Sequence, residues 1–255
     1  MKQNKYDDAK FFTQYKQMPR SVKGLEGAGE WPVLKALLPA LQNKSVLDLG
    51  CGFGWHCRYA GEQQANAVVG VDISENMLRE AREQTDDPKI TYVRMPIEDI
   101  QFSNSQFDVV ISSLAFHYVD SFEAICTKVY DCLKPAGNFI FSVEHPIFTS
   151  RKEQTWYVDD HGHRLHWPVD HYQSEGMRET TFLTEHVIKY HRTVATYLNN
   201  LIQAGFVIKA VKEPGPTKAM LESDPAMLDE DRRPMFLIIA AEKRETHMGN
   251  ADIDR

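Results

Sequence analysis

The sequence has no long hydrophobic run, so we expect no helix that crosses a membrane. No apolar stretch in the 255 residues approaches the ~18 residues that such a helix needs. The stretch from Met1 to Lys10 is polar and charged, and it lacks the apolar centre of a signal peptide. These absences favour a cytoplasmic protein that does not bind membranes.

Cysteine is scarce, and its spacing matches neither a disulfide framework nor a zinc site. The chain has 4 cysteines and no CxxC pair, so we expect reduced thiols in the core. Internal repeats and low-complexity tracts are absent as well. The hydrophobic content of 42% is sufficient to bury a substantial core.

Positive charge is also in deficit. The 29 Lys and Arg residues are outnumbered by 36 Asp and Glu residues, which gives a formal net charge of -7. Proteins that bind nucleic acid neutralise its phosphates with Lys and Arg, so this balance argues against an RNA or DNA substrate. A small molecule is the expected partner.

Short apolar runs alternate with helical patterns between residues 45 and 143. The predicted helices between the runs cover residues 55–64, 75–84 and 122–133. This alternation indicates an α/β fold with a mostly parallel sheet covered on both faces. The apolar runs predict strands at Ser45–Leu49, Ala67–Val71, Ile90–Val93, Phe107–Ser112 and Asn138–Val143.

The remaining segments surround this core. Helices are predicted at 8–16, 30–41 and 193–204, with a glycine-rich loop at 18–29. Strands at 206–211 and 235–241 can pair antiparallel through a loop from Pro214 to Pro234. Residues 146–190 are too long and too aromatic for a simple connection, and a hairpin is predicted at 155–167. We therefore divide the chain into an N-terminal helical cap segment (1–44), a cofactor-binding core (45–145), a cap insertion for the substrate (146–190), and the C-terminal part of the core with its tail (191–255).

A glycine loop follows the first predicted strand and opens a helix. Glycines let the backbone turn sharply and approach a ligand, and the helix N-terminus supplies free N–H groups. A dinucleotide fingerprint would need glycine at position 55, where this chain has Trp55. Asp48 at the mouth of the loop opposes a pyrophosphate but suits the ammonium and sulfonium groups of S-adenosylmethionine (SAM).

Asp72 ends the next strand and lies 22 positions beyond Gly50. An acidic residue at an offset of about 20 reaches a ribose hydroxyl in nucleotide-binding folds. Met77 is placed to cover an adenine face with its soft side chain. A domain without a nucleotide, whose glycines only tighten a turn, would leave Asp48 and Asp72 without a role.

These residues resemble the motifs of the class I SAM-dependent methyltransferase superfamily, in particular its small-molecule branch with the ubiquinone and menaquinone biosynthesis enzymes. The stretch 46–54 resembles the first motif, and 71–78 resembles the ribose and adenine segment. The stretch 107–118 resembles the fourth-strand motif, and 133–137 the turn before strand five. The resemblance implies a Rossmann-like three-layer sandwich whose seven-stranded sheet has the order 3-2-1-4-5-7-6, with an antiparallel terminal strand.

The same resemblance implies the cofactor site. Where many relatives carry an Asp that contacts the adenine amine, this chain has Pro96, so Glu98 or the backbone of Ile97 must take that contact. Adenine methyltransferases of nucleic acid usually carry an Asn-Pro-Pro-Tyr-like motif, and this chain lacks it. The expected cofactor-binding residues are Tyr15, Asp48, Gly50, Cys51, Gly52, Gly54, Asp72, Ile73, Met77, Ile97, Glu98, Ser113 and Leu114.

Histidines close to the predicted strand ends are the candidates for catalysis. Methyl transfer needs the acceptor held in line in a dry site, and a hydroxyl or acidic carbon also benefits from a general base. His117 and His145 follow strands four and five. His191 is a third candidate, and it is expected to begin a helix together with Arg192.

The cap and the segment that follows it offer candidates for binding the methyl acceptor. Arg192 can pair with an anionic group, and Trp167 and Tyr172 can form an aromatic pocket. The cap is also a candidate surface for contacts between subunits. Its histidines and aspartates match no metal-ligand template, so we predict no metal site.

Taken together, the residues predict an enzyme that transfers a methyl group from SAM to an unidentified small molecule and releases S-adenosylhomocysteine (SAH). Two alternatives stay open at this point. One is a non-enzymatic protein that binds SAM or SAH, and the other is an NAD(P)-dependent oxidoreductase.

Overall fold

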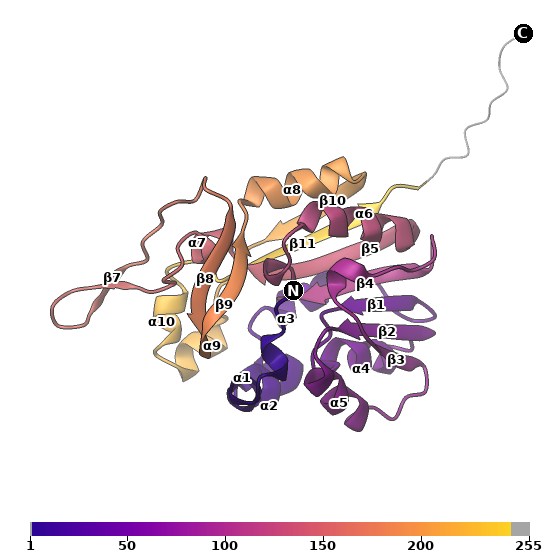
Figure 1. Ribbon diagram of the computed structural model, residues 1–255, viewed down its shortest axis with the longest axis horizontal. Helices are drawn as coiled ribbons and strands as arrows, with labels where there is room; N and C mark the ends of the chain where they lie inside the picture. The colour runs from indigo at the N-terminus through magenta and orange to yellow at the C-terminus, as the bar shows by residue number, and fades with distance from the viewer. Residues whose placement is uncertain (1, 246–255) are drawn as a thin grey trace, which may run out of the picture.

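A seven-stranded sheet with helices on both faces forms the centre of the molecule (Figure 1). The structure is a computed structural model and describes residues 2–245. Within these residues, no helix is both long and apolar enough to cross a membrane. The strands of the sheet are β1 (Ser45–Leu49), β2 (Ala67–Asp72), β3 (Ile90–Arg94), β4 (Phe107–Ser113), β5 (Leu133–Glu144), β10 (Phe206–Lys212) and β11 (Phe236–Lys243).

The order of the strands across the sheet is β3-β2-β1-β4-β5-β11-β10. Strands β1 to β5 pair in parallel, whereas β11 is antiparallel to both β5 and β10. The expected Rossmann-like arrangement is confirmed, with β10 and β11 as its sixth and seventh strands. Their higher numbers arise because β6 to β9, in and next to the cap insertion, precede them in the chain.

Helices cover both faces of the sheet, and successive residues of a central strand point to opposite faces, so each strand contributes to two cores. Phe139 and Phe141 of β5 belong to one hydrophobic core, and Ile140 between them belongs to the other. Only the strand ends are therefore left to form a site. The covering helices are α3 (Trp31–Leu37) and α4 (Trp55–Glu62) on one face, α6 (Phe122–Cys132) and α8 (Val194–Gln203) on the other, and α5 (Glu75–Glu83) beside β3.

The N-terminal segment contains more helix than expected. The two predicted helices are present as α1 (Ala9–Tyr15) and α3, but the expected loop at 18–29 contains α2 (Pro19–Val22) and a 3-10 helix at Gly24–Gly27. Pro19 is the local cause, since its fixed backbone angle suits a first helical turn.

The cap insertion contains two hairpins instead of the one predicted. The expected hairpin is β6 (Tyr157–Val158) with β7 (Arg164–His166), which follows α7 (Pro146–Thr149). The second hairpin is β8 (Gly176–Phe182) with β9 (Thr184–His191). Its turn passes through Leu183 at a φ of 60°. Glycine is the usual residue at such a position, and its absence explains why the sequence did not predict this hairpin.

The expected helix start at His191 and Arg192 is wrong. His191 is the last residue of β9, and α8 begins three residues later, at Val194. Thr193 caps that helix, because its side chain accepts a hydrogen bond from the Thr196 N–H over 3.1 Å.

The expected loop from Pro214 to Pro234 also has helical structure of its own. It contains α9 (Lys218–Ser223) and α10 (Met227–Glu230), which lie beside the hairpins of the cap insertion (Figure 1). Asp229 of α10 pairs with Arg164 of β7 over 2.9 Å. The loop and the insertion therefore cover the same end of the sheet.

Candidate active site

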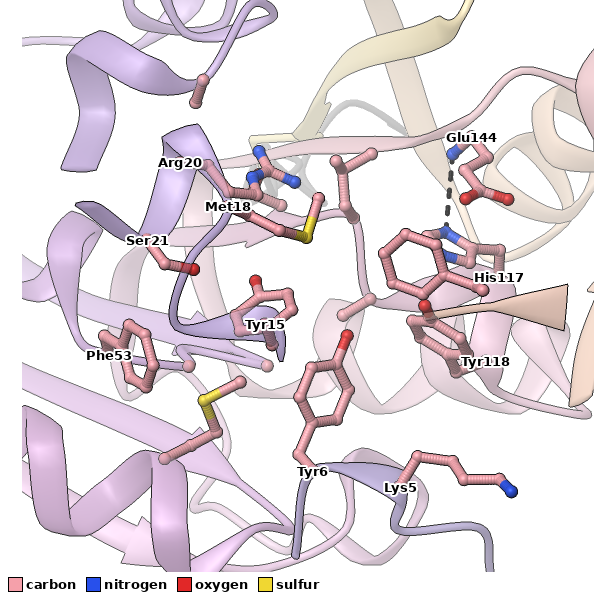
Figure 2. A pocket seen from close by; sticks show the side chains of 18 of the residues that line it. Lys5, Tyr6, Tyr15, Met18, Arg20, Ser21, Phe53, His117, Tyr118 and Glu144 are labelled. Carbon is pink, nitrogen blue, oxygen red and sulfur yellow. Dashed lines mark hydrogen bonds between the residues drawn. The ribbon is translucent and has the colours of Figure 1, made fainter. Parts of the chain in front are cut away.

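A cavity of about 610 Å³ lies at the carboxyl ends of β1, β2 and β4 (Figure 2). Open α/β sheets bind their ligands at this edge, and the volume is within the usual range of ligand pockets. The core supplies one end of the cavity through the loop after β1 and the end of β2. The N-terminal segment and the cap insertion supply the rest of its walls, including Tyr6, Tyr15 and Phe182.

The glycine loop is fixed to the neighbouring strand β2. The N–H groups of Gly50 and Cys51 both donate to the carbonyl oxygen of Val71, over 2.8 and 3.0 Å. Gly52 has a φ of 51°, and a Cβ atom on it would meet nothing within 4 Å, because the position opens into the cavity. At Gly54 a Cβ atom would lie 2.2 Å from the Tyr92 hydroxyl. The two glycines therefore differ: Gly52 leaves space for a ligand, and Gly54 allows close packing.

Asp72 connects the end of β2 to this loop. Its Oδ2 accepts from the Gly52 N–H, and its Oδ1 accepts from the Ser74 N–H, both over 2.9 Å. Burial raises the pKa of Asp72 to about 6, so the carboxyl is ionised at neutral pH. Each carboxylate oxygen keeps a further lone pair for a ligand hydroxyl.

Asp48 lies behind the loop instead of at its mouth. It is 1% exposed and is not among the residues that line the cavity. Its Oδ2 accepts from the Cys57 thiol over 3.3 Å, and its Oδ1 has no hydrogen-bond partner among the described residues. Burial raises the pKa of Asp48 to about 7. Neither Asp48 nor Gly54 is among the residues that line the cavity, so the structure gives their predicted contact with the cofactor no direct support, and it stays a prediction.

The other cofactor-binding residues predicted from the sequence do come together around the cavity. Met77 is 2% exposed and lies at the same end as Asp72, with the turn after β3. The end of β4 forms a neighbouring wall, where Ser113 donates to Glu30 over 3.1 Å. The predicted residues that line the cavity are Tyr15, Gly50, Cys51, Gly52, Asp72, Ile73, Met77, Ile97, Glu98, Ser113 and Leu114.

The N-terminal segment places aromatic rings in the cavity. The ring of Tyr6 packs edge-on against Tyr15, with centroids 5.0 Å apart, and against Tyr118 at 6.3 Å (Figure 2). Arg20, which is partly exposed, forms an ion pair with the buried Glu30 in the same region. Tyr6 was missed from the sequence, although the close spacing of Tyr6, Phe11 and Tyr15 in a polar stretch was a usable signal.

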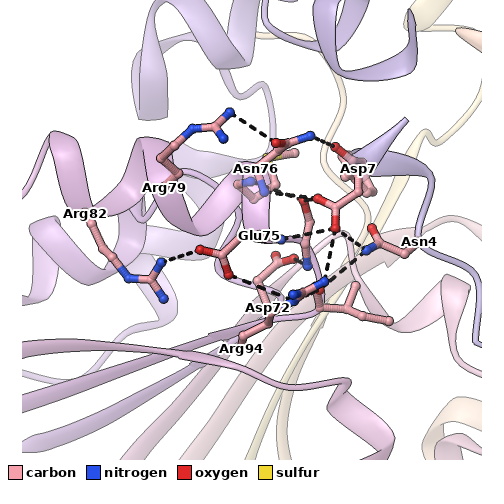
Figure 3. A network of polar contacts seen from close by, with 12 residues as sticks. Asn4, Asp7, Asp72, Glu75, Asn76, Arg79, Arg82 and Arg94 are labelled. Atoms are coloured by element: carbon pink, nitrogen blue, oxygen red, sulfur yellow. Dashed lines mark hydrogen bonds and ion pairs between the residues drawn. The ribbon is translucent and has the colours of Figure 1, made fainter. Parts of the chain in front are cut away.

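A polar network holds this segment against the core (Figure 3). Asp7 accepts from the Ser74 hydroxyl over 2.6 Å and from the Asn76 N–H over 3.0 Å. Ser74 is also the residue whose N–H contacts Asp72. The segment is therefore attached directly beside the carboxylate that we expect to bind the ribose.

His117 lines the cavity, as predicted, but its hydrogen bonding does not suit a base. The backbone N–H of Glu144 donates to its Nδ1 over 3.4 Å (Figure 2). Burial lowers the pKa of His117 to about 4, so the ring is neutral at physiological pH. A neutral ring whose Nδ1 accepts carries its proton on Nε2, so that nitrogen is a donor.

His145 and His191 do not line the cavity, and both rings are engaged in contacts elsewhere, so the structure does not bring them together with the other predicted site residues. The Nδ1 of His145 accepts from the Ile147 N–H over 3.1 Å, and its Nε2 contacts Glu213 over 2.7 Å. His191 is held between the Thr149 hydroxyl and the Tyr172 carbonyl, both at 2.9 Å. Both nitrogens of each ring are occupied by structural contacts.

The three substrate-binding candidates also lie outside the cavity lining. Arg192 is buried and donates to three backbone carbonyls, those of residues 116, 119 and 120. Tyr172 accepts from the Val194 N–H over 3.1 Å. Trp167 stacks on Phe148 with ring centroids 5.0 Å apart. The polar groups of Arg192 and Tyr172 are thus engaged with the backbone, and the contact of all three residues with the acceptor stays a prediction.

The sequence also did not indicate an ion pair that links the core to the insertion. Lys189 of β9 donates to Glu144 of β5 over 2.7 Å and to Gln154 over 3.1 Å, and all three line the cavity. The Lys189 side chain is only 1% exposed. Among residues 2–245, no group of three or more His, Cys, Asp and Glu side chains could hold a metal ion.

The fold and the cavity are those of a Rossmann-like protein that binds a nucleotide-type ligand. Comparison with known proteins identifies the family. The methyltransferase domain family matches residues 47–141. The chain is 44% identical to an S-adenosylmethionine-dependent methyltransferase from Mesorhizobium loti, with a TM-score of 0.81. That match covers 86% of this chain and 100% of the solved chain.

Two further comparisons agree. A Listeria monocytogenes protein, solved as a candidate SAM-dependent methyltransferase, is 53% identical over 85% of this chain and 99% of its own, with a TM-score of 0.80. A malonyl-[acyl-carrier protein] O-methyltransferase from Enterobacter lignolyticus is 35% identical over 50% of this chain and 49% of its own length. The chain belongs to the SAM-dependent methyltransferases, and its cofactor is SAM.

Proposed function

We propose that this cavity holds SAM beside a small organic molecule, transfers the methyl group to it, and releases SAH. The observation that carries the proposal is the pairing of Gly52 with Asp72. Gly52 has open space above it, and its N–H is already bonded to the carboxylate that would accept the ribose hydroxyls.

The residues along the cavity match the parts of the cofactor in order. Asp72 would accept from the ribose, and Met77 with Ile97 would pack against the adenine, with Glu98 close to its amine. The backbone at Gly50 and Ser113 would face the methionine end. The Oε2 of Glu30 is buried without a hydrogen-bond partner among residues 2–245, which suits an incoming ammonium group.

Arg20 and Tyr15 would bind the carboxylate of the methionine part. Arg20 is held in place by its ion pair with Glu30, so its guanidinium is oriented before the ligand arrives. The N-terminal segment (1–44) would thus close over the cofactor, and the cap insertion (146–190) would enclose the acceptor. The β6–β7 hairpin exposes Tyr157, Val158 and Leu165, and it is our candidate surface for contacts between subunits.

Calorimetric titration of the purified protein with SAM, SAH and NADH in parallel tests the proposal. Micromolar binding of SAM and SAH without a signal from NADH would support it. Binding of NADH without SAM would overturn it and favour an oxidoreductase. Incubation of the SAM complex with a panel of small acceptors, with SAH as the readout, separates an enzyme from a protein that only binds SAM.

A further inference from the structure

The end of the cavity away from the glycine loop brings together a hydrogen-bond donor and a hydrogen-bond acceptor. His117 and Glu144 both line this region, and they are linked through the Glu144 N–H and the His117 Nδ1 (Figure 2). With Nδ1 occupied, the neutral imidazole can only donate, from Nε2. The carboxylate of Glu144 can only accept.

Half of the Glu144 carboxylate is unused. Its Oε1 accepts from Lys189, but its Oε2 is buried and has no hydrogen-bond partner within the described part of the chain. Burial alone would raise the pKa of Glu144, yet the neighbouring Lys189 ammonium holds it below its usual value. A buried carboxylate oxygen that stays ionised and unpaired costs free energy, so a ligand with an O–H or N–H group fits here.

The walls around this pair are aromatic. Phe11 packs against Tyr6, with ring centroids 4.9 Å apart and an interplanar angle of 77°, and against Phe182 at 5.9 Å and 65°. Tyr118 lines the same region. Such walls favour a planar ring, because aromatic rings pack well edge-to-face and offset.

We propose that the methyl acceptor is an aromatic hydroxyl compound, a phenol, whose oxygen lies between His117 and Glu144. This inference rests on the proposed SAM-dependent activity. The N–H donor of His117 favours oxygen over nitrogen as the atom that receives the methyl group. A neutral amine has one lone pair, which it needs for attack on the methyl group, so it cannot also accept from His117. A hydroxyl oxygen has two lone pairs and can do both while its proton points to Glu144.

The reaction then balances without any further reagent. The phenol oxygen attacks the methyl carbon, an O–CH₃ bond forms, and the C–S bond breaks with its electron pair moving to sulfur. The positive charge of the sulfonium is lost, and the phenol proton moves to Oε2 of Glu144. The products are an aryl methyl ether, SAH and a protonated carboxyl that returns its proton to water.

Binding to the SAH complex gives the first test. Naphthol, naphthylamine and methoxynaphthalene share one ring system and differ only in the group offered to the site. We expect naphthol to bind at least about tenfold more tightly than methoxynaphthalene, which has no hydroxyl proton. Normal SAH binding with no preference for naphthol, or with none of the three bound, would overturn the phenol assignment and leave the cofactor assignment intact. Failure to bind SAH would instead overturn the proposed function.

Turnover of the SAM-loaded protein gives the second test. We expect methyl transfer to naphthol and not to naphthylamine, and a fall in kcat of about 100-fold or more in Glu144→Gln, with SAH affinity within about twofold of the wild type. Raising the pH should restore much of the rate, because naphtholate needs no base. Wild-type kcat in Glu144→Gln, or faster transfer to naphthylamine, would contradict the proposal.

Controls separate this role from a structural one. Glu213→Gln makes the same chemical change at an exposed carboxylate outside the cavity and should leave kcat unchanged. Glu144→Gln leaves the buried Lys189 ammonium without a counter-charge, which is expected to destabilise the fold. The double variant Glu144→Gln with Lys189→Met removes both charges, and it should fold, bind SAH and show the same loss of kcat and the same recovery at high pH.

Discussion

The N–H of Gly52 donates to Oδ2 of Asp72 over 2.9 Å, so the carboxylate assigned to the ribose also sets the position of the glycine loop. Loop and carboxylate belong to different strand ends, β1 and β2, which lie side by side in the sheet. Binding of the cofactor therefore needs little rearrangement of the backbone in this region. A substitution at either Gly52 or Asp72 should therefore shift the position of the other residue.

Gly52→Val should abolish binding of SAM and SAH, because the branched side chain would occupy the space that the ligand needs. Calorimetric titration with SAH measures the loss. Valine at a positive φ is also strained, so the matched control is Gly162→Val, where φ is 81° and a Cβ atom likewise meets nothing within 4 Å. Gly162 lies in the β6–β7 turn, and this control should bind SAH normally. Near-normal affinity in Gly52→Val would refute the site.

The affinity for SAH should fall as the solution becomes acidic. Burial raises the pKa of Asp72 to about 6, and only the ionised carboxylate can accept from both ribose hydroxyls. Between pH 7 and pH 5 the ionised fraction falls about tenfold, and the association constant should follow it. Titrations across this range, with Asp72→Asn as a comparison, check the effect. The variant should bind weakly with a flatter profile, and a wild-type affinity independent of pH would rule out this role.

Asp48→Asn should change how stability depends on pH. The pKa of Asp48 is about 7 in the folded protein, against about 3.9 when unfolded, so its protonated form stabilises the fold. That stabilisation is complete below about pH 4 and is lost as the pH rises through 7. The variant should therefore gain on the wild type over this window, by up to about 4 kcal/mol. Urea unfolding at several pH values measures the difference, and parallel curves would contradict it.

Arg192→Gln should reduce stability and leave SAH binding nearly unchanged. The guanidinium satisfies three carbonyls in the turn that carries His117, and the variant leaves some of them buried and unpaired. The expected loss is about 2 kcal/mol in the free energy of unfolding. Urea unfolding and SAH titration test both parts. Lost SAH binding at wild-type stability would place Arg192 in the site after all.

The cofactor end of the cavity could be predicted from the sequence because its residues lie in short, ordered motifs. Gly50, Gly52 and Asp72 fall within one strand-loop-helix-strand unit, Met77 lies in the helix that follows it, and the chemistry of each suits a part of SAM. Asp48 was misplaced because a motif gives the order of residues along the chain and not which side of the loop each one faces.

The acceptor end could not be predicted, because its residues are distant in the sequence. Tyr6, Glu144 and Lys189 meet only after the N-terminal segment and the β8–β9 hairpin have folded onto the sheet. Histidines were the more visible candidates from the sequence. In the structure, His145 and His191 are fixed by neighbouring hydroxyl, carboxyl and backbone groups, contacts that follow from tertiary packing alone.

The Glu144–Lys189 pair joins a strand of the core to a strand of the insertion. In the proposed function the insertion encloses the acceptor, and it can diverge without disturbing the strand ends that would hold SAM. Exchanging residues 146–190 for the equivalent segment of a relative would then be a way to obtain a methyltransferase with a new acceptor, provided that the graft keeps a cation opposite Glu144.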